Sequence, residues 1–231
     1  MKAGSTTCTG MQNWKRNLGA WALAGVMALW AGPVLAQAGP LQCGGGAISA
    51  QARVLADEVN LARTDPNGYA ALVEAYFAGL QGKRYKLGNV TMVMQEGRPA
   101  VTEAVRALKR QKPVPALDVS GCLSAAAQDH VAHQGPRGGF GHVGPGGQGP
   151  SDRVARHVRG RPYCGENISY GIADPRGVVI QLIVDDGVPG RGHRKNIFDP
   201  RFRSLGTATG PHAKLRNMAV QVFCFNQVTG G

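Results

Sequence analysis

The sequence predicts an α+β domain in which a sheet formed late in the chain is covered by helices on its faces. Apolar residues at helical spacing dominate the earlier part of the chain, whereas closely spaced β-like segments gather near its end. An apolar leader precedes the domain and leaves about 190 residues, which is enough for one domain with a real core. No internal repeat is visible.

Helices are predicted where apolar residues recur every three or four positions. Four such segments are 50–63, 67–77, 99–111 and 117–134. Asp65-Pro66 resembles a helix cap followed by proline at the first helical position. Asp174-Pro175 opens a later helix in the same way, and we expect that helix to stop at Gly187.

Strands are predicted where β-prone residues cluster between glycines and polar turns. These segments are 90–94, 163–171, 203–210 and 216–226. Between the first and second of these strands, a Gly-rich loop covers 135–150. A short helix is expected to follow this loop through 158. Residues 188–199 are expected to form a loop with one turn of helix.

Residues 1–38 have the composition of a signal peptide. They contain the basic pair Lys15 and Arg16, then an almost wholly apolar run over 18–35, then small residues up to Ala38. That order is typical of a secretory signal, here cleaved near Ala38. The alternative is a retained membrane anchor, although the run is barely long enough to span a bilayer. We therefore predict an exported protein, secreted or periplasmic, with no transmembrane anchor after cleavage.

Removal of this leader leaves four cysteines. They are Cys43, Cys122, Cys164 and Cys224. An even number of cysteines in an exported chain predicts two disulfides, and the three possible pairings stay open at this point. The domain itself is predicted to span 50–228, after a flexible lead-in over 39–49.

The mature chain is basic. Removing the leader takes away three of the 26 basic residues and none of the 14 acidic ones, which leaves a net charge of +9. Such a balance can suit an anionic partner. The basic residues are scattered, however, and no RNA-binding or DNA-reading motif occurs, so no nucleic-acid partner is expected.

Four polar residues stand out because nothing in the local sequence explains them. They are His142 in a Gly-rich loop, Glu166 inside a predicted strand, Asp185 at the end of a predicted helix and His193 after a glycine. Carboxylates are disfavoured within strands, and Asp185 lies near the inward stripe of its helix. Asp186, next to it, should face about 100° away on an ideal helix.

Two imidazoles and two carboxylates that come together support two kinds of chemistry. They can bind a divalent metal such as Zn²⁺ through nitrogen and oxygen. They can instead share protons in a hydrogen-bonded network without a metal. Arg153 is expected to anchor the loop after His142, and the nearby His130 and His133 are expected to be structural.

Several short motifs occur in a recognisable order along the chain. They are FGHVG (140–144), GENISYG (165–171) and RGHRKNIF (191–198), together with Asn60-x-x-Arg63 and Asp152-Arg153. In these motifs the sequence resembles the CAP superfamily, which comprises cysteine-rich secretory proteins, antigen 5 and plant pathogenesis-related 1 proteins. The agreement runs from about residue 50 to 226. The sequence is most similar to bacterial members with an SCP-like domain, and this similarity includes the segment EGRPAVTEAVRALKRQKPVPAL.

The resemblance implies an α-β-α sandwich with a central, largely antiparallel sheet flanked by helices. It also implies a large cleft lined by two histidines and two acidic residues, which by position are His142, Glu166, Asp185 and His193. The chain departs from the animal and plant pattern at Asp185, where that pattern has Glu, and at Leu182, where it has Trp. The carboxylate of Asp185 is therefore shorter by one methylene.

Three functions remain open on these residues. The cleft can belong to an interaction module that binds a small ligand, a lipid or a peptide, with or without a metal. It can instead belong to a metal-dependent, peptidase-like hydrolase, in which Glu166 acts as general base on a water held by His142 and His193. The third function is purely structural, with the four residues tying helix, strand and loops together. No motif names a reaction, so we favour the module.

Overall fold

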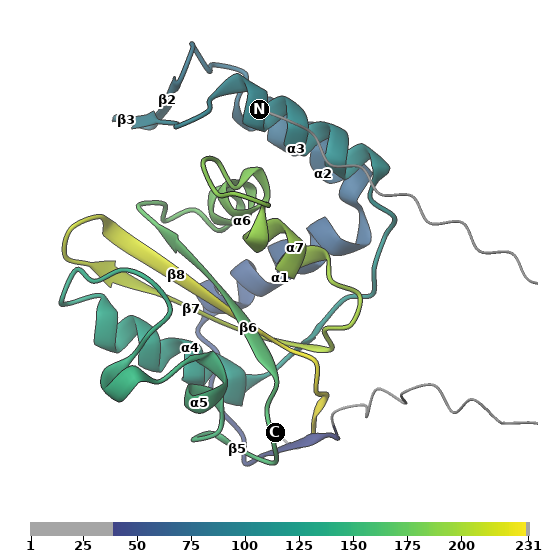
Figure 1. The fold of residues 1–231 in the computed structure, drawn as a ribbon, viewed down its shortest axis with the longest axis vertical. Helices are drawn as coiled ribbons and strands as arrows, with labels where there is room; N and C mark the ends of the chain where they lie inside the picture. The colour runs from purple at the N-terminus through teal and green to yellow at the C-terminus, as the bar shows by residue number, and fades with distance from the viewer. Residues whose placement is uncertain (1–38, 230–231) are drawn as a thin grey trace, which may run out of the picture. The chain divides into compact units, whose positions relative to one another are not determined.

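A four-stranded sheet lies at the centre of the part of the chain that the computed structural model describes, residues 39–229 (Figure 1). Its strands run in the order β4, β7, β8, β6, with the bounds β4 (Asp118–Val119), β7 (Ser204–His212), β8 (Arg216–Cys224) and β6 (Cys164–Tyr170). The three long strands are antiparallel, and β4 is parallel to β7. The predicted α+β class with a largely antiparallel central sheet is confirmed.

Alternation along the central strands divides the core into two layers. On β8, Ala219 and Phe223 belong to one apolar cluster, whereas Val220 and Val222 belong to the other. Successive side chains of a strand point to opposite faces, so each face of the sheet needs its own cover.

Five helices build the larger layer on one face (Figure 1). Their bounds are α1 (Ala50–Thr64), α2 (Pro66–Tyr76), α3 (Arg98–Arg110), α6 (Pro175–Val184) and α7 (Gly192–Phe198). Helix α1 contacts β7 and α6, helices α6 and α7 contact β6, and α3 packs between α2 and α6. This layer holds Leu55, Leu108, Ile180 and Ile183, each at most 1% exposed.

The opposite face is covered by α4 (Gly121–Gln134) and the short α5 (Pro150–Val154). Helix α4 lies along β7 and β8 (Figure 1). Gly206 on β7 lets the two elements approach closely, since a Cβ there would lie 2.1 Å from the backbone of Leu123. Between α4 and α5 runs the Gly-rich loop that carries His142, with one 3₁₀ turn (Pro145–Gly147).

Two smaller sheets complete the fold. The three-stranded one joins β5 (Val158–Arg159), β1 (Leu41–Cys43) and β9 (Val228–Thr229), and the two-stranded one is the hairpin of β2 (Arg84–Leu87) and β3 (Val90–Val93). The segment 39–49, expected as a flexible lead-in, thus contains a strand. It gains order because β1 pairs with two strands and is tied to α4 by a disulfide.

Both predicted disulfides are confirmed, and the structure selects one of the three pairings. Cys43 bonds to Cys122, and Cys164 bonds to Cys224. The second bond joins residues that lie directly opposite each other on β6 and β8.

Helix boundaries follow local capping chemistry. The side chains of Asp65 and Asp174 accept hydrogen bonds from Gly68 N and Gly177 N, as expected for helix caps. Helix α4 begins at Gly121 rather than at 117, since Ser120 caps it and β4 pairs with β7 just before. Within residues 39–229, we find no helix that has both the length and the apolar character to cross a membrane. The predicted signal peptide, 1–38, lies outside the described residues.

Candidate functional site

The two predicted histidines lie next to each other in space. His142 comes from the loop between α4 and α5, and His193 is the second residue of α7. The centroids of their rings are 6.5 Å apart, and the ring planes meet at 40°. Each imidazole has a carboxylate partner of its own, so the four predicted residues form two histidine–carboxylate pairs.

The first pair joins His142 to Glu166, in the middle of β6. His142 Nδ1 lies 3.0 Å from Glu166 Oε1, and the other carboxylate oxygen accepts a hydrogen bond from Arg153 Nη2. Arg153 also donates from Nη1 to the carbonyl oxygens of His142, at 3.0 Å, and Gln148, at 3.2 Å. It anchors the loop, as expected from the sequence. The carboxylate of Glu166 is completely buried, while the side chain of His142 is 47% exposed.

The second pair joins His193 to Asp185. Asp185 Oδ1 lies 2.6 Å from His193 Nδ1, and Oδ2 accepts a hydrogen bond of 2.9 Å from the backbone N of the same histidine. Asp185 is not on the inward stripe of α6, because the helix ends at Val184 and Asp185 adopts the left-handed conformation, with φ 54°. This reversal turns the short side chain back toward the start of α7.

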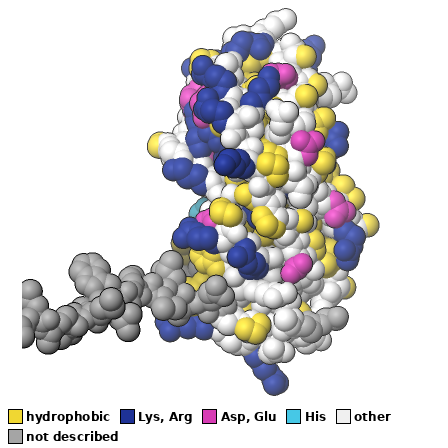
Figure 2. Space-filling model, turned by 90° about the vertical axis from the view of Figure 1, so that its right-hand side faces the viewer, with side chains coloured by type: hydrophobic (Ala, Val, Ile, Leu, Met, Phe, Trp, Pro, Cys, Tyr) yellow, Lys and Arg dark blue, Asp and Glu magenta, His cyan; other side chains and the backbone are white. Residues whose placement is uncertain are grey.

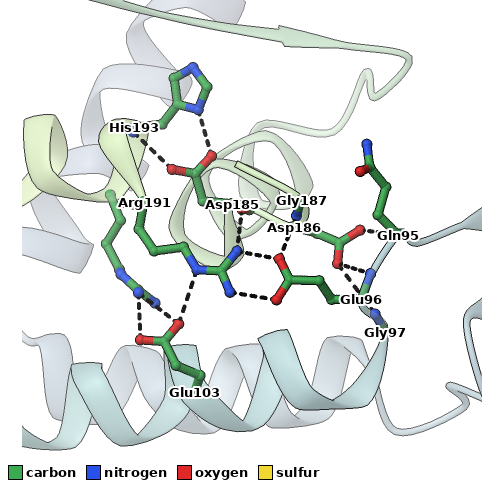
Figure 3. Close-up of polar contacts among 10 residues, drawn as sticks. Gln95, Glu96, Gly97, Glu103, Asp185, Asp186, Gly187, Arg191 and His193 are labelled. Atoms are coloured by element: carbon green, nitrogen blue, oxygen red, sulfur yellow. Dashed lines mark hydrogen bonds and ion pairs between the residues drawn. The ribbon is translucent and has the colours of Figure 1, made fainter. Parts of the chain in front are cut away.

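A network of charged residues fastens this second pair to the segment before α3 (Figure 3). Arg191 donates to Asp185 O at 2.8 Å and makes two hydrogen bonds to the Glu96 carboxylate, at 2.6 and 2.8 Å. Glu96 Oε1 also accepts from the backbone N of Gly187 at 2.7 Å. We call Glu96 and Arg191 the surface clamp. Its geometry fixes both ends of the loop between α6 and α7.

Two further carboxylates extend these contacts. Asp186 accepts hydrogen bonds from the backbone N atoms of Gln95, Glu96 and Gly97, at 2.5, 2.9 and 3.3 Å, where α3 begins. Glu103 on α3 receives Arg194 and lies 3.4 Å from Arg191 Nε. Asp185 and Asp186 have different partners, but the ideal-helix geometry by which the sequence separated them does not apply, because α6 ends at Val184.

Electrostatics follow the same contacts. The hydrogen bonds from Arg191 and from Gly187 N lower the pKa of Glu96 from its usual 4.5 to about 2. The same ion pair raises the pKa of Arg191. Both side chains therefore stay charged across the pH range in which most proteins are folded.

Each histidine of the site uses Nδ1 for its carboxylate, which leaves the other ring nitrogen, Nε2, outside the pair. An ionised carboxylate only accepts hydrogen bonds, so the proton between each pair sits on Nδ1 of the imidazole. In the neutral ring, Nε2 then carries a free lone pair. This is the arrangement that proteins use for histidines that bind metals, with the carboxylate orienting the ring from behind.

His130 is structural, as the sequence suggested. It is fully buried on α4, and its Nε2 lies 3.0 Å from Gly141 O, next to His142. Burial lowers its pKa, which keeps the ring neutral. Gln134 and Tyr170 hold the same glycine, through hydrogen bonds of 2.8 Å to its O and 3.0 Å from its N.

An apolar pocket of about 330 Å³ adjoins the second pair. His193 and Asp185 line its polar end, and its apolar lining includes Tyr85, Met92 and Leu182. His142 and Glu166 are not among the lining residues, so the pocket adjoins the His193–Asp185 pair and does not include the His142–Glu166 pair. In Figure 2, a histidine is visible at an indentation of the surface with Lys and Arg side chains on both sides.

The sequence analysis missed the surface clamp and the pocket. Glu96 and Arg191 lie in segments with no local signal for a charge pair, and the contact between them depends on how α3 meets the loop after α6. The strand β2, which supplies one wall of the pocket, was also not predicted. The only local hint was Asp186 beside Gly187, which marks a helix end.

Comparison with known proteins points to one family. The model of the CAP family, described as the cysteine-rich secretory protein family, matches residues 51–226. Among curated proteins, none matches the sequence. A solved extracellular protein with an SCP domain from Bacillus anthracis is 22% identical, with a TM-score of 0.40, over 48% of this chain and 34% of that one. An outer surface protein of Borrelia burgdorferi is 16% identical, with a TM-score of 0.41, over 48% of this chain and 78% of that one. The matched part thus spans about a third of the Bacillus protein.

Proposed function

Because the chain belongs to the cysteine-rich secretory protein (CAP) family, we propose that it is an exported binding module whose cleft presents two imidazoles to a ligand. Export is supported by the signal-like leader and by two disulfides, which form in oxidising compartments.

The observation that carries this proposal is the pairing of each Nδ1 with a buried carboxylate. The two pairs hold the rings 6.5 Å apart and leave both Nε2 atoms for a ligand. A polar network with only a structural role would not need to expose almost half of the His142 side chain. The rings are therefore preorganised for an external group.

A divalent metal such as Zn²⁺ fits this site through two nitrogen ligands. Residues His142 and His193 would supply them, and Glu166 and Asp185 would orient the rings rather than bind the ion, because their oxygens already accept hydrogen bonds. In the range 39–229, no three or more His, Cys, Asp or Glu side chains gather as a metal-binding group. A bound ion would act as a Lewis acid with positions left for the ligand.

The hydrolase is the weaker alternative. A general base must reach the proton that it removes. Glu166 has no exposed side-chain surface, and its two oxygens are held by His142 and Arg153. That geometry favours an orienting role for Glu166 over a catalytic one.

Calorimetric titration with Zn²⁺ tests the proposal. We expect measurable heat in the wild type and its loss in His142→Ala, in His193→Ala and in the double variant. His133→Ala is the matched control, because His133 lies on α4 away from both pairs, and it should bind like the wild type. Absence of heat in the wild type, or equal heat in the double variant, would remove the metal from the proposal.

The module and the hydrolase differ in one further respect. A ligand that binds the imidazoles should still bind Glu166→Gln, whereas a hydrolase would lose all turnover in this variant. The comparison requires that the variant is folded, which circular dichroism can establish before binding is measured.

A further inference from the structure

The outer edge of β6 carries backbone groups without partners in the described part of the chain. Tyr163 O accepts from Phe225 N at 3.0 Å, and Gly171 N donates to Asn217 O at 2.9 Å. Antiparallel pairs alternate, so the odd residues of β6 bond to β8, and the even residues point their N–H and C=O away from the sheet. Strand β6 ends the strand order, so this second side has no neighbouring strand.

Side chains cover this edge at its two ends but not in its middle. Ser151 accepts from Cys164 N at 3.1 Å, Asn196 reaches Glu166 O at 3.4 Å, and Gln181 reaches Tyr170 O at 3.4 Å. Among residues 39–229, nothing bonds to the N–H or C=O of Ile168. Ile168 is only 6% exposed, and buried backbone groups are almost always satisfied by protein, water or ligand.

The same middle part of β6 borders the apolar pocket. Ile168 and Tyr170 line it together with the apolar residues Met92 and Leu182. The pocket mouth also has exposed apolar surface, since Val93 is 69% exposed. The pocket thus combines a strand edge that offers hydrogen bonds with an apolar lining.

Exposed basic residues stand beside two of the lining residues in the sequence. Arg84 and Lys86 are exposed on β2, next to Tyr85, and Lys214 and Arg216 are exposed on either side of Leu215. None of the four forms an ion pair with a described residue. The acidic groups at the polar end, Asp185 and Asp186, are already held by His193 and by the start of α3.

From these contacts we propose that the cleft binds an extended peptide, which adds as a strand to the edge of β6 at Ile168. A large apolar side chain of the peptide enters the pocket, and acidic residues on either side of it meet the exposed basic residues Arg84, Lys86, Lys214 and Arg216. Strand addition combines backbone hydrogen bonds, which provide affinity, with a pocket that reads alternate side chains. This inference rests on the proposed binding role of the cleft and names the class of its ligand.

A lipid explains fewer of these features. An aliphatic chain would fill the apolar wall, but it has neither donors nor acceptors for Ile168 N–H and C=O. A peptide backbone satisfies both, and acidic side chains complement the four exposed basic residues. A fatty acid is therefore the competing ligand in the test.

The test uses the full mature chain and a set of fluorescent capped peptides. Each has the form Glu-Thr-X-Thr-Glu, with Ala, Val, Leu, Phe or Trp at the centre. We expect affinity to rise from Ala to the larger apolar centres and to fall several-fold when Gln replaces both Glu. No binding by any member, or binding of a fluorescent fatty acid in their place, would overturn the proposal.

Backbone methylation of the best peptide tests the strand geometry without altering the protein. Only every second N–H of an added strand faces β6. N-methylation at the central residue and N-methylation at both Thr should therefore differ, with one peptide losing at least tenfold in affinity and the other binding like its parent. Equal effects of the two modifications would exclude strand addition.

A protein variant gives the complementary result. Ile168→Pro removes the outward N–H without removing a hydrogen bond to β8, and edge strands tolerate proline in this orientation. We expect it to lose peptide binding at least tenfold and to keep its Zn²⁺ heat, while Ile168→Val keeps both. Zn²⁺ binding without peptide binding would refute the inference alone, and peptide binding without Zn²⁺ heat would refute only the metal proposal.

Discussion

The two histidine–carboxylate pairs of the cleft reach the same geometry by different means. Glu166 sits in a regular strand and is held by a buried arginine that is 1% exposed. Asp185 sits past a helix end in a left-handed conformation and is held by its own loop and by the surface clamp. The first pair therefore depends on contacts within the protein core. The second depends on the loop between α6 and α7, which hydrogen bonds to Glu96 hold in place.

This difference predicts which half of the site tolerates change. A buried charge pair cannot lose one member without leaving an uncompensated charge in a medium of low polarity. Exposed ion pairs contribute little to global stability, but they can still order a loop. We expect core substitutions to unfold the protein and clamp substitutions to loosen only the His193 side.

The largest effect is expected for Arg153→Leu. It leaves the Glu166 carboxylate buried with His142 alone, which should lower the free energy of unfolding by about 3–5 kcal/mol. Urea denaturation measures this change in the free energy of unfolding. The double variant Arg153→Leu/Glu166→Leu removes both charges and should recover much of the loss. If Arg153→Leu alone is as stable as the wild type, the buried Arg153–Glu166 pair does not stabilise the His142 side of the site.

A smaller effect is expected for Asp185→Ala. Alanine does not favour φ 54°, and the variant also loses the hydrogen bonds to His193, so we expect a loss of about 1–2 kcal/mol in unfolding free energy. Asp185→Asn is the matched control, because asparagine tolerates this backbone conformation. The control should be nearly as stable as the wild type yet bind Zn²⁺ about 10–100-fold more weakly. Unchanged affinity in Asp185→Asn would contradict the orienting role of the carboxylate.

Arg191→Ala should act locally. It removes the hydrogen bonds to Glu96 and to Asp185 O but no buried charge pair, so global stability should change far less than in Arg153→Leu. Hydrogen exchange of the amides from 185 to 193 should become roughly tenfold faster, since the loop loses its attachment. Arg201→Ala removes an exposed ion pair elsewhere and should leave these amides unchanged. Equal exchange in the two variants would show that the clamp does not order the loop.

The smallest effect concerns acid pH. The pKa of Glu96 falls from 4.5 to about 2 on folding, so its stabilising contribution is complete above pH 4.5 and is lost as pH falls toward 2. The stability difference between wild type and Glu96→Gln should therefore shrink over this window and be constant above it. Urea denaturation between pH 2 and 7 measures the difference. A difference that grows as pH falls would contradict the sign of the shift.

Much of the fold could be predicted from local patterns. Helices α1 and α3 and strands β6, β7 and β8 lie within a few residues of their predicted bounds, because apolar periodicity and capping residues act over short distances. Strand β2 was missed, because Arg84–Leu87 alternates weakly and becomes a strand only through pairing with β3. The end of α6 was placed two residues too late, because Asp185 leaves the helix only when its carboxylate finds the start of α7.

The sequence by itself determined the layered α+β class, the number of disulfides and the four residues of the two histidine–carboxylate pairs. Each of these follows from residue type, spacing or motif order. Only the tertiary structure decided which cysteines pair, that Arg153 holds the Glu166 carboxylate and the surface clamp holds the backbone of Asp185, and that the edge of β6 borders an apolar pocket. Several of these contacts join residues 60 or more positions apart, as Cys164–Cys224 and Glu96–Arg191 are. Local patterns carry no information on contacts whose partners are chosen by how the helices pack on the sheet.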